Sequence, residues 1–371
     1  MDPLSPEQRQ ALLDGPAGAP PAGQVPNLAD PSNLLEAGRA IILVFWILPT
    51  IFLVVRLYTK ACILRSVRIS DFAMLIAWAL YMGYMPTGWL MNNVSRGLDQ
   101  WNLRLRDFIS MLYYFHVDSI IYGICIFFIK LSILLQFLEI FSQHQRDYFF
   151  WSCHCLIWVN FLFYAISTFL EIFACHPFAK AWDVLITRGD CPVDTNLLNV
   201  IASSVNAASD LIILVLPQTR IWQLHLAVGK KIAISAVFSV GLLASASAVV
   251  RLAYAVLLFT TTNNISYFGY MAGIWTLPEI ACGIIAGCLP SSAKFLQTLS
   301  QSPLVLKWGS TLQNLISSSS RQDRGSESGV CAKGGPQSAV LANEHWAEPD
   351  QYPLTSFATE PGTRRSLSSF Q

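Results

Sequence analysis

Long apolar runs separated by short polar stretches dominate this chain. Seven runs each hold about 20 mainly apolar residues, the number that a helix needs to cross a bilayer core about 30 Å thick. They lie at Ala40–Leu57, Phe72–Leu90, Phe108–Phe128, Phe149–Phe173, Leu197–Leu216, Ile232–Phe259 and Phe268–Leu289. Hydrocarbon offers backbone amides no partner, and the alternating segments of a transmembrane barrel are missing, so the runs must be helices. The pattern therefore predicts an all-α, polytopic membrane protein: a seven-transmembrane-helix bundle with disordered termini.

The polar stretches outside these runs set the domain boundaries. The start of the chain is rich in Pro, Ala and Gly and lacks the apolar core of a signal peptide, whereas the end is dominated by Ser, Gly and charged residues. We divide the chain into a disordered N-terminus (1–38), the bundle (39–291), a candidate interfacial amphipathic helix (300–316) and a disordered cytoplasmic tail (317–371).

Composition agrees with a chain that faces lipid. Hydrophobic residues make up 53% of the 371 residues and charged residues only 13%, against roughly 25% charged residues in an average soluble domain. The net charge of +1 lacks the broad basic field that nucleic-acid binding needs. The lipid bilayer is thus an expected partner, and nucleic acid is not.

The basic residues predict an orientation, because cytoplasmic loops carry an excess of Lys and Arg. The first, third and fifth loops and the end of the last helix hold more of them than the opposite side does. The two sets are Arg56, Lys60, Arg65, Arg68, Arg146, Arg220, Lys230, Lys231 and Lys294 against Arg39, Arg96, Arg104, Arg106, Lys180 and Arg188. We therefore expect a multi-pass protein of the plasma membrane or an endomembrane, with its N-terminus outside and its C-terminus cytoplasmic.

The loops assigned to the outside carry two kinds of modification signal. Asn93 and Asn264 begin Asn-x-Ser sequons, so they are candidate N-glycosylation sites. Cys175 and Cys191 share a third outside loop, where an oxidising lumen favours a disulfide. Free thiols near the membrane surface are the alternative for these two cysteines.

Polar residues inside the spans are the candidate functional residues, since each ionisable group at bilayer depth costs about 2.5–3.5 kcal/mol on insertion scales. Asn199, Ser203, Asn206 and Asp210 follow the i, i+4, i+7, i+11 spacing of one helical face. Asp118 lies on a similar stripe of the third run, with Tyr114, Tyr122 and Cys125. The third and fifth helices are therefore expected to line a shared polar interior.

Arg251 in the sixth run and Glu279 in the seventh complete this set of deep charges. Arg251 is a partner for one of the acids, with Glu171 as another candidate, although its position near a helix end also allows snorkelling. A structural ion pair and a ligand-contacting role are both open for Arg251.

The sequence lacks the residues that several cofactor and metal functions require. The seventh run contains no lysine for a retinal Schiff base, and we interpret Lys130 and Lys231 as snorkelling anchors at cytoplasmic helix ends. The sequence Cys153-His154-Cys155 cannot chelate one ion alone, because helix neighbours face different directions. We expect no cofactor, no metal and no catalytic residue.

From the third run onward the sequence resembles the fungal rhodopsin-like integral membrane proteins of the satratoxin-cluster membrane protein type. The resemblance covers roughly residues 40 to 300. It is carried by Lys130-Leu131-Ser132-Ile133-Leu134, Cys175-His176-Pro177, Ala181-Trp182-Asp183, Cys191, Asp210, Leu216-Pro217, Ile221-Trp222-Gln223-Leu224, Lys230-Lys231, Arg251-Leu252, Trp275, Glu279 and Cys288-Leu289-Pro290. It adds Trp275 to the candidate interior residues. The resemblance implies a seven-helix, receptor-like topology in a fungus.

Many relatives of this kind lie near secondary-metabolite or mycotoxin gene clusters, so the resemblance favours an accessory, non-catalytic pathway component. Its partners would be a small apolar metabolite or pathway enzymes. A G-protein-coupled-receptor-like sensor, with a G protein as partner, is the alternative. A membrane-embedded cyclase with Asp118, Asp210 and Glu279 as general acids is a second alternative. Transport ranks last, because internal repeats and broken helices are missing.

Overall fold

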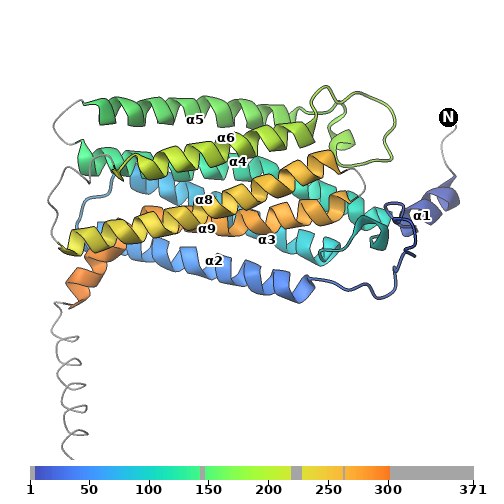
Figure 1. The fold of residues 1–371 in the computed structure, drawn as a ribbon, viewed down its shortest axis with the longest axis horizontal. Coiled ribbons are helices and arrows are strands. Elements are labelled where there is room, and N and C mark those ends of the chain that lie inside the picture. Colours follow the sequence, from blue (N-terminus) through green and yellow to red (C-terminus); the bar gives the residue numbers. More distant parts are fainter. Residues whose placement is uncertain (1–4, 143–146, 219–227, 262–263, 301–371) are drawn as a thin grey trace, which may run out of the picture. The chain divides into compact units, whose positions relative to one another are not determined.

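The computed structural model describes residues 5–142, 147–218, 228–261 and 264–300, and within them every regular element is a helix. The long helices are α2 (Leu35–Tyr58), α3 (Ile69–Ser95), α4 (Leu105–Phe141), α5 (Tyr148–Ile172), α6 (Thr195–Val215), α8 (Val228–Thr260) and α9 (Ile265–Ser300). A short helix, α1 (Pro6–Asp14), precedes them. The long helices run side by side (Figure 1), so the all-α prediction is confirmed.

Each predicted apolar run lies within one long helix to within one residue. Six of these helices are long and apolar enough to cross a membrane. The exception is α3, where Trp, Tyr, Gly, Pro and Asn dilute the apolar residues. Its 27 residues still span about 40 Å at 1.5 Å per residue.

The core of the bundle lies where α2, α3, α4 and α9 meet. Its fully buried side chains include Ile42, Met74, Tyr81, Ile129 and Ile280. The outward faces carry large exposed apolar side chains, among them Trp158 on α5 and Leu243 on α8. Apolar residues on both faces are what a helix between core and lipid requires.

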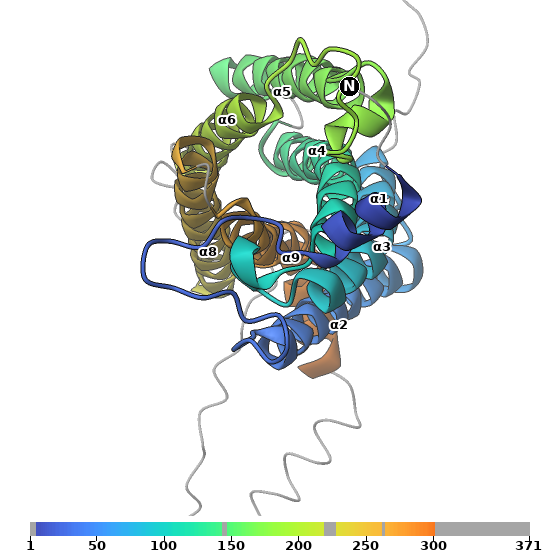
Figure 2. The ribbon, with the colours of Figure 1, turned by 90° about the vertical axis from the view of Figure 1, so that its right-hand side faces the viewer.

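The segment before α2 is more ordered than the sequence indicates. Disorder was expected over residues 1–38, yet Ser5 and Gln8 form a capping box that starts α1. The backbone amide of Ala17 then donates to the carbonyl of Leu103 at 2.8 Å, and that of Leu105 donates to Gly15 at 3.0 Å. This segment crosses the end of the bundle that carries α1 (Figure 2). We call it the disulfide end, because the Cys175–Cys191 disulfide lies in the loop after α5 at this end.

At the opposite end of the bundle, a buried arginine on α2 bonds to three other helices. We call this the cavity end, because a cavity lined by Phe137, Leu214 and Phe238 lies there. Arg56 was counted among the loop charges, but it is fully buried on α2. Its guanidinium donates to Asp71 on α3 at 2.9 Å, to Gln136 on α4 at 3.0 Å and to the carbonyl of Gly287 on α9. Arg56 therefore lies inside the bundle on α2 and not in the first loop, where it was counted, because its polar partners are buried there.

The predictions for the C-terminal part cannot be compared with the structure. The interfacial helix predicted over 300–316 and the tail predicted over 317–371 lie outside the described residues, apart from Ser300, the last residue of α9.

Candidate functional site

The centre of the bundle holds an ion pair between Arg251 on α8 and Glu279 on α9. The Nε of Arg251 lies 2.7 Å from Oε2 of Glu279. Its other two nitrogens donate to Ser203 on α6 at 3.0 Å and to the hydroxyl of Tyr122 on α4 at 2.7 Å. Tyr122 in turn donates to Oε1 of Glu279 at 2.7 Å. Four helices thus contribute to one buried network.

A second ion pair lies next to this network. The Nζ of Lys130 on α4 is 2.9 Å from Oδ1 of Asp210 on α6 and also donates to the carbonyl of Asn206. The side-chain amide of Asn206 donates to Glu279 at 2.6 Å, and its oxygen accepts from Tyr164 at 2.7 Å. Asn206 therefore connects the two pairs, and we call the whole set the central network.

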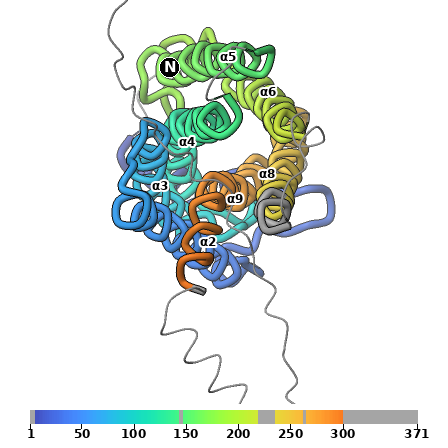
Figure 3. The backbone as a smooth tube through the Cα atoms, turned by 90° about the vertical axis from the view of Figure 1, so that its left-hand side faces the viewer, coloured from blue at the N-terminus to red at the C-terminus, as the bar shows by residue number. Residues whose placement is uncertain are grey.

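The central network forms part of the wall of a cavity of about 550 Å³. Its lining includes six charged residues: Lys130, Asp210 and Glu279 of the central network, and Lys60, Glu139 and Lys294. Apolar side chains such as Phe137, Leu214 and Phe238 line much of the rest. Helices α4, α6, α8 and α9 surround this space at the cavity end (Figure 3). A volume of 300–1,000 Å³ with mainly apolar walls and few polar groups is typical of small-molecule sites.

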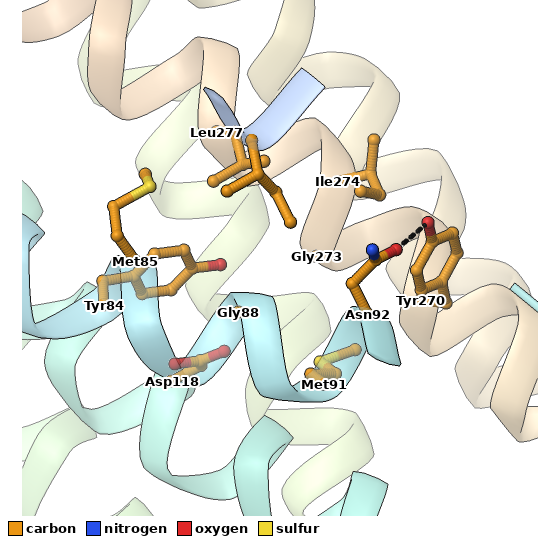
Figure 4. A pocket seen from close by; sticks show the side chains of 11 residues that line it. Tyr84, Met85, Gly88, Met91, Asn92, Asp118, Tyr270, Gly273, Ile274 and Leu277 are labelled. Carbon is orange, nitrogen blue, oxygen red and sulfur yellow. Dashed lines mark hydrogen bonds between the residues drawn. The ribbon is translucent and has the colours of Figure 1, made fainter. Parts of the chain in front are cut away.

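Asp118 lies apart from these pairs, towards the disulfide end. Its side chain is 6% exposed and accepts a hydrogen bond from the hydroxyl of Thr87 on α3. It borders two small cavities of about 20 and 40 Å³. Figure 4 shows the first of them, with Asp118 beside Tyr84 and Met91.

The structure brings most of the predicted interior residues together. The stripe on α6 faces the interior: Ser203, Asn206 and Asp210 join the central network, and Asn199 lines the cavity shared by Asp118 and Arg251. Trp275 is different, because its side chain is 36% exposed and lines none of these cavities. Its inclusion among the interior residues is not supported.

Sequence reasoning misassigned the cation opposite Asp210. Lys130 is 2% exposed and paired rather than snorkelling. The length of α4 could have indicated the buried position of Lys130, because this helix continues to Phe141 and so places Lys130 well inside it. The side chain of Lys231 lies outside what the structure describes.

The disulfide end contains a third pair and the predicted disulfide. Nδ1 of His116 on α4 lies 3.4 Å from Glu171 on α5, so Glu171 is not the partner of Arg251. Cys175 and Cys191 are joined by a disulfide in the loop after α5.

The two sequon asparagines are engaged in hydrogen bonds. The side-chain amide of Asn264 donates to Asp99 at 2.7 Å, and its oxygen accepts from the backbone amide of Gln100. The oxygen of Asn93 accepts from Arg39 at 3.0 Å. Glycosylation of either asparagine stays a prediction, and at Asn264 a glycan would be attached to the nitrogen that donates to Asp99.

In the described part of the chain, no group of three or more His, Cys, Asp or Glu side chains could hold a metal ion. Helix α9 extends beyond the predicted seventh run and includes Lys294, 15 residues after Glu279. Lys294 lines the same large cavity as Glu279, near the C-terminal end of the helix.

Comparisons with known proteins agree with these features. The chain is 28% identical over 289 residues to "Fugralins biosynthesis cluster protein 2" of Gibberella zeae, covering 77% of this chain and 71% of that protein. It is 36% identical over 182 residues to a "SAT4 family membrane protein" of Emericella nidulans, covering 49% of this chain and 45% of the relative. No solved structure matches the chain. The fungal rhodopsin domain matches residues 55–298, and the chain therefore belongs to the fungal rhodopsin domain family.

Proposed function

We propose that this protein is an accessory, non-catalytic membrane component of a fungal secondary-metabolite pathway, and that it binds an apolar small molecule in the cavity beside the central network. The observation that carries the proposal is the cavity of about 550 Å³ with mainly apolar walls and the charged groups of the central network among its lining residues. The similarity to a biosynthesis cluster protein supports the pathway context.

The polar groups of the cavity suit binding better than catalysis. Asp210 is paired with Lys130 and Glu279 with Arg251, and a carboxylate held by a cation is a poor proton donor. Their charges are already balanced, so a largely apolar ligand enters without having to neutralise either pair. One or two polar atoms on the ligand are enough to fix its orientation.

The proposal includes the topology. We infer that α3 is the seventh span, because it is long enough to cross a bilayer and lies alongside α2 and α4 in all three ribbon and tube views (Figures 1–3). Seven spans put the termini on opposite sides of the membrane. With the N-terminus outside, the cavity end faces the cytoplasm, where a pathway enzyme delivers or collects a product.

Gene deletion and complementation test the function. The deletion strain should lose or redistribute one family of metabolites, and wild-type protein should restore it. Ala244→Phe fills the cavity from α8, whereas the matched control Ala246→Phe places the same side chain on the exposed face of that helix. We expect only Ala244→Phe to fail in complementation, provided that both variants reach the membrane at wild-type level. An unchanged metabolite profile in the deletion strain contradicts the proposal.

A receptor-like sensor is the second candidate. It is favoured by the central network, which connects α4, α6, α8 and α9 around the cavity, so a ligand that displaced one partner would act on several helices. Ligand-dependent coupling to a G protein, measured by nucleotide exchange, separates it from the accessory role.

The cyclase alternative is weaker in this geometry. Of the three deep acids, only Asp118 has no bonded cation among the described residues. The cavities beside Asp118, of about 20 and 40 Å³, are far smaller than a terpenoid. If Asp118→Asn, Asp210→Asn and Glu279→Gln all leave the metabolite profile unchanged, the cyclase hypothesis is excluded.

A further inference from the structure

The environment of Asp118 leaves a negative charge without a counter-ion. Its bonded partner in the structure is the neutral hydroxyl of Thr87. Arg251 borders the same cavity, but its three guanidinium nitrogens already bond Glu279, Ser203 and Tyr122. An isolated buried carboxylate is strongly unfavourable unless a cation or a proton neutralises it.

The space next to Asp118 fits a species about as large as a water molecule. The two cavities that it borders have volumes of about 20 and 40 Å³, and a single water needs roughly 10–15 Å³ by the same kind of measure. Tyr84, Met91 and Gly273 also border both cavities, so Asp118 lies at the place where the two spaces approach one another. Figure 4 labels these residues among those that line the first cavity.

The other polar groups around the second cavity supply oxygen atoms, apart from Arg251, whose guanidinium is bonded to Glu279, Ser203 and Tyr122. Hydroxyls come from Ser119, Tyr84 and Thr276, and Asn199 supplies a side-chain carbonyl oxygen. The side-chain amide nitrogen of Asn199 donates to the carbonyl of Thr195, which leaves its oxygen free to face a cation. Oxygen ligands are the preference of hard cations.

We propose that Asp118 binds a monovalent cation of the size of sodium, with hydroxyl and amide oxygens from α3, α4, α6 and α9 and bound water completing its coordination. One carboxylate balances one positive charge. A divalent ion is disfavoured, because the two other deep acids already pair with Arg251 and Lys130 and calcium sites usually gather several carboxylates. This site is separate from the large cavity and does not depend on the proposed function.

Thermal unfolding of the purified full chain in detergent tests the proposal. In sodium chloride the melting temperature should exceed that in choline chloride of equal ionic strength by about 2–4 °C, because a bound ion stabilises the folded state. Potassium chloride should give a smaller increase. Asp118→Asn should abolish the difference between sodium and choline, whereas the control Glu171→Gln, which removes a buried acid paired with His116, should keep it.

Two further variants keep the test decisive if Asp118→Asn fails to fold. Tyr84→Phe and Thr276→Val each remove one candidate oxygen ligand, so each should raise the sodium concentration needed for half-maximal stabilisation several-fold. Equal melting temperatures of the wild type in sodium and choline would overturn the proposal and leave a protonated Asp118 as the explanation. A sodium effect that survives in Asp118→Asn, or in both ligand variants if that variant does not fold, would also overturn it.

Discussion

Two arginines are buried among the residues that the structure describes, and their surroundings differ. Arg56 is fully buried, bonds groups of α3, α4 and α9, and itself lines none of the three cavities, although its partner Gln136 lines the large one. Arg251 is likewise bonded to three side chains, but it lines a small cavity directly, and its partner Glu279 lines the large one. Similar ion pairs can therefore serve either to join helices or to line a binding space, and the difference is whether the arginine itself borders a cavity.

The largest loss of stability is expected from replacing Arg56, which links α2 to α3, α4 and α9. Arg56→Met leaves Asp71 buried and without its main cation, since Lys60 lies farther away at 3.7 Å. Breaking one side of a buried pair costs about 3–5 kcal/mol. Thermal unfolding in detergent should show this loss for Arg56→Met and little change for Arg68→Met, whose side chain is 45% exposed. Equal melting temperatures for the two variants would contradict a structural role for Arg56.

A smaller loss is expected at the second arginine. Glu279→Gln keeps the shape of the side chain but leaves Arg251 without its carboxylate. Water from the adjoining cavity can hydrate the exposed charge, so we expect a loss of about 1–3 kcal/mol. The same unfolding assay measures it, with Glu36→Gln, an exposed partner of Arg39, as control. A loss as large as that of Arg56→Met would mean that both arginines serve the same structural purpose.

The smallest net effect is expected from replacing the pair of Lys130 and Asp210 as a unit. The double variant Lys130→Met with Asp210→Leu exchanges two charges for apolar groups, which is often nearly neutral. Lys130→Met alone leaves Asp210 without its cation, so this single variant should be clearly less stable than the double variant. A double-mutant cycle of melting temperatures gives the coupling between the two positions. Additive losses would show that the charges of this pair do not interact.

The sequence predicted the positions of the helices well and the bonding partners of the buried side chains less well. Apolar run length located every long helix that the structure describes, because the cost of unpaired amides in hydrocarbon leaves no alternative. The spacing of Asn199, Ser203, Asn206 and Asp210 also identified an inward face. The rotation of one helix against another cannot be read from spacing alone, so Arg251 could be assigned to several acids. Its pairing with Glu279 required the structure.

Two misassignments share one physical cause. Lys130 and Arg56 lie near the ends of their apolar runs, where long basic side chains commonly reach the membrane surface. In this fold Asp210 and Asp71 lie closer than the surface does, and both bases turn inward. The order of the segment before α2 was missed because it rests on backbone bonds to Leu103 and Leu105, which composition does not reveal.

Native mass spectrometry of the protein purified from a producing strain tests the central claim most directly. If the cavity beside the central network binds a pathway metabolite, the wild type and Ala246→Phe should carry the same extra small-molecule mass, and Ala244→Phe should lack it. If all three proteins carried that mass equally, or if the wild type carried none while the strain made the metabolite, the cavity would not be the binding site.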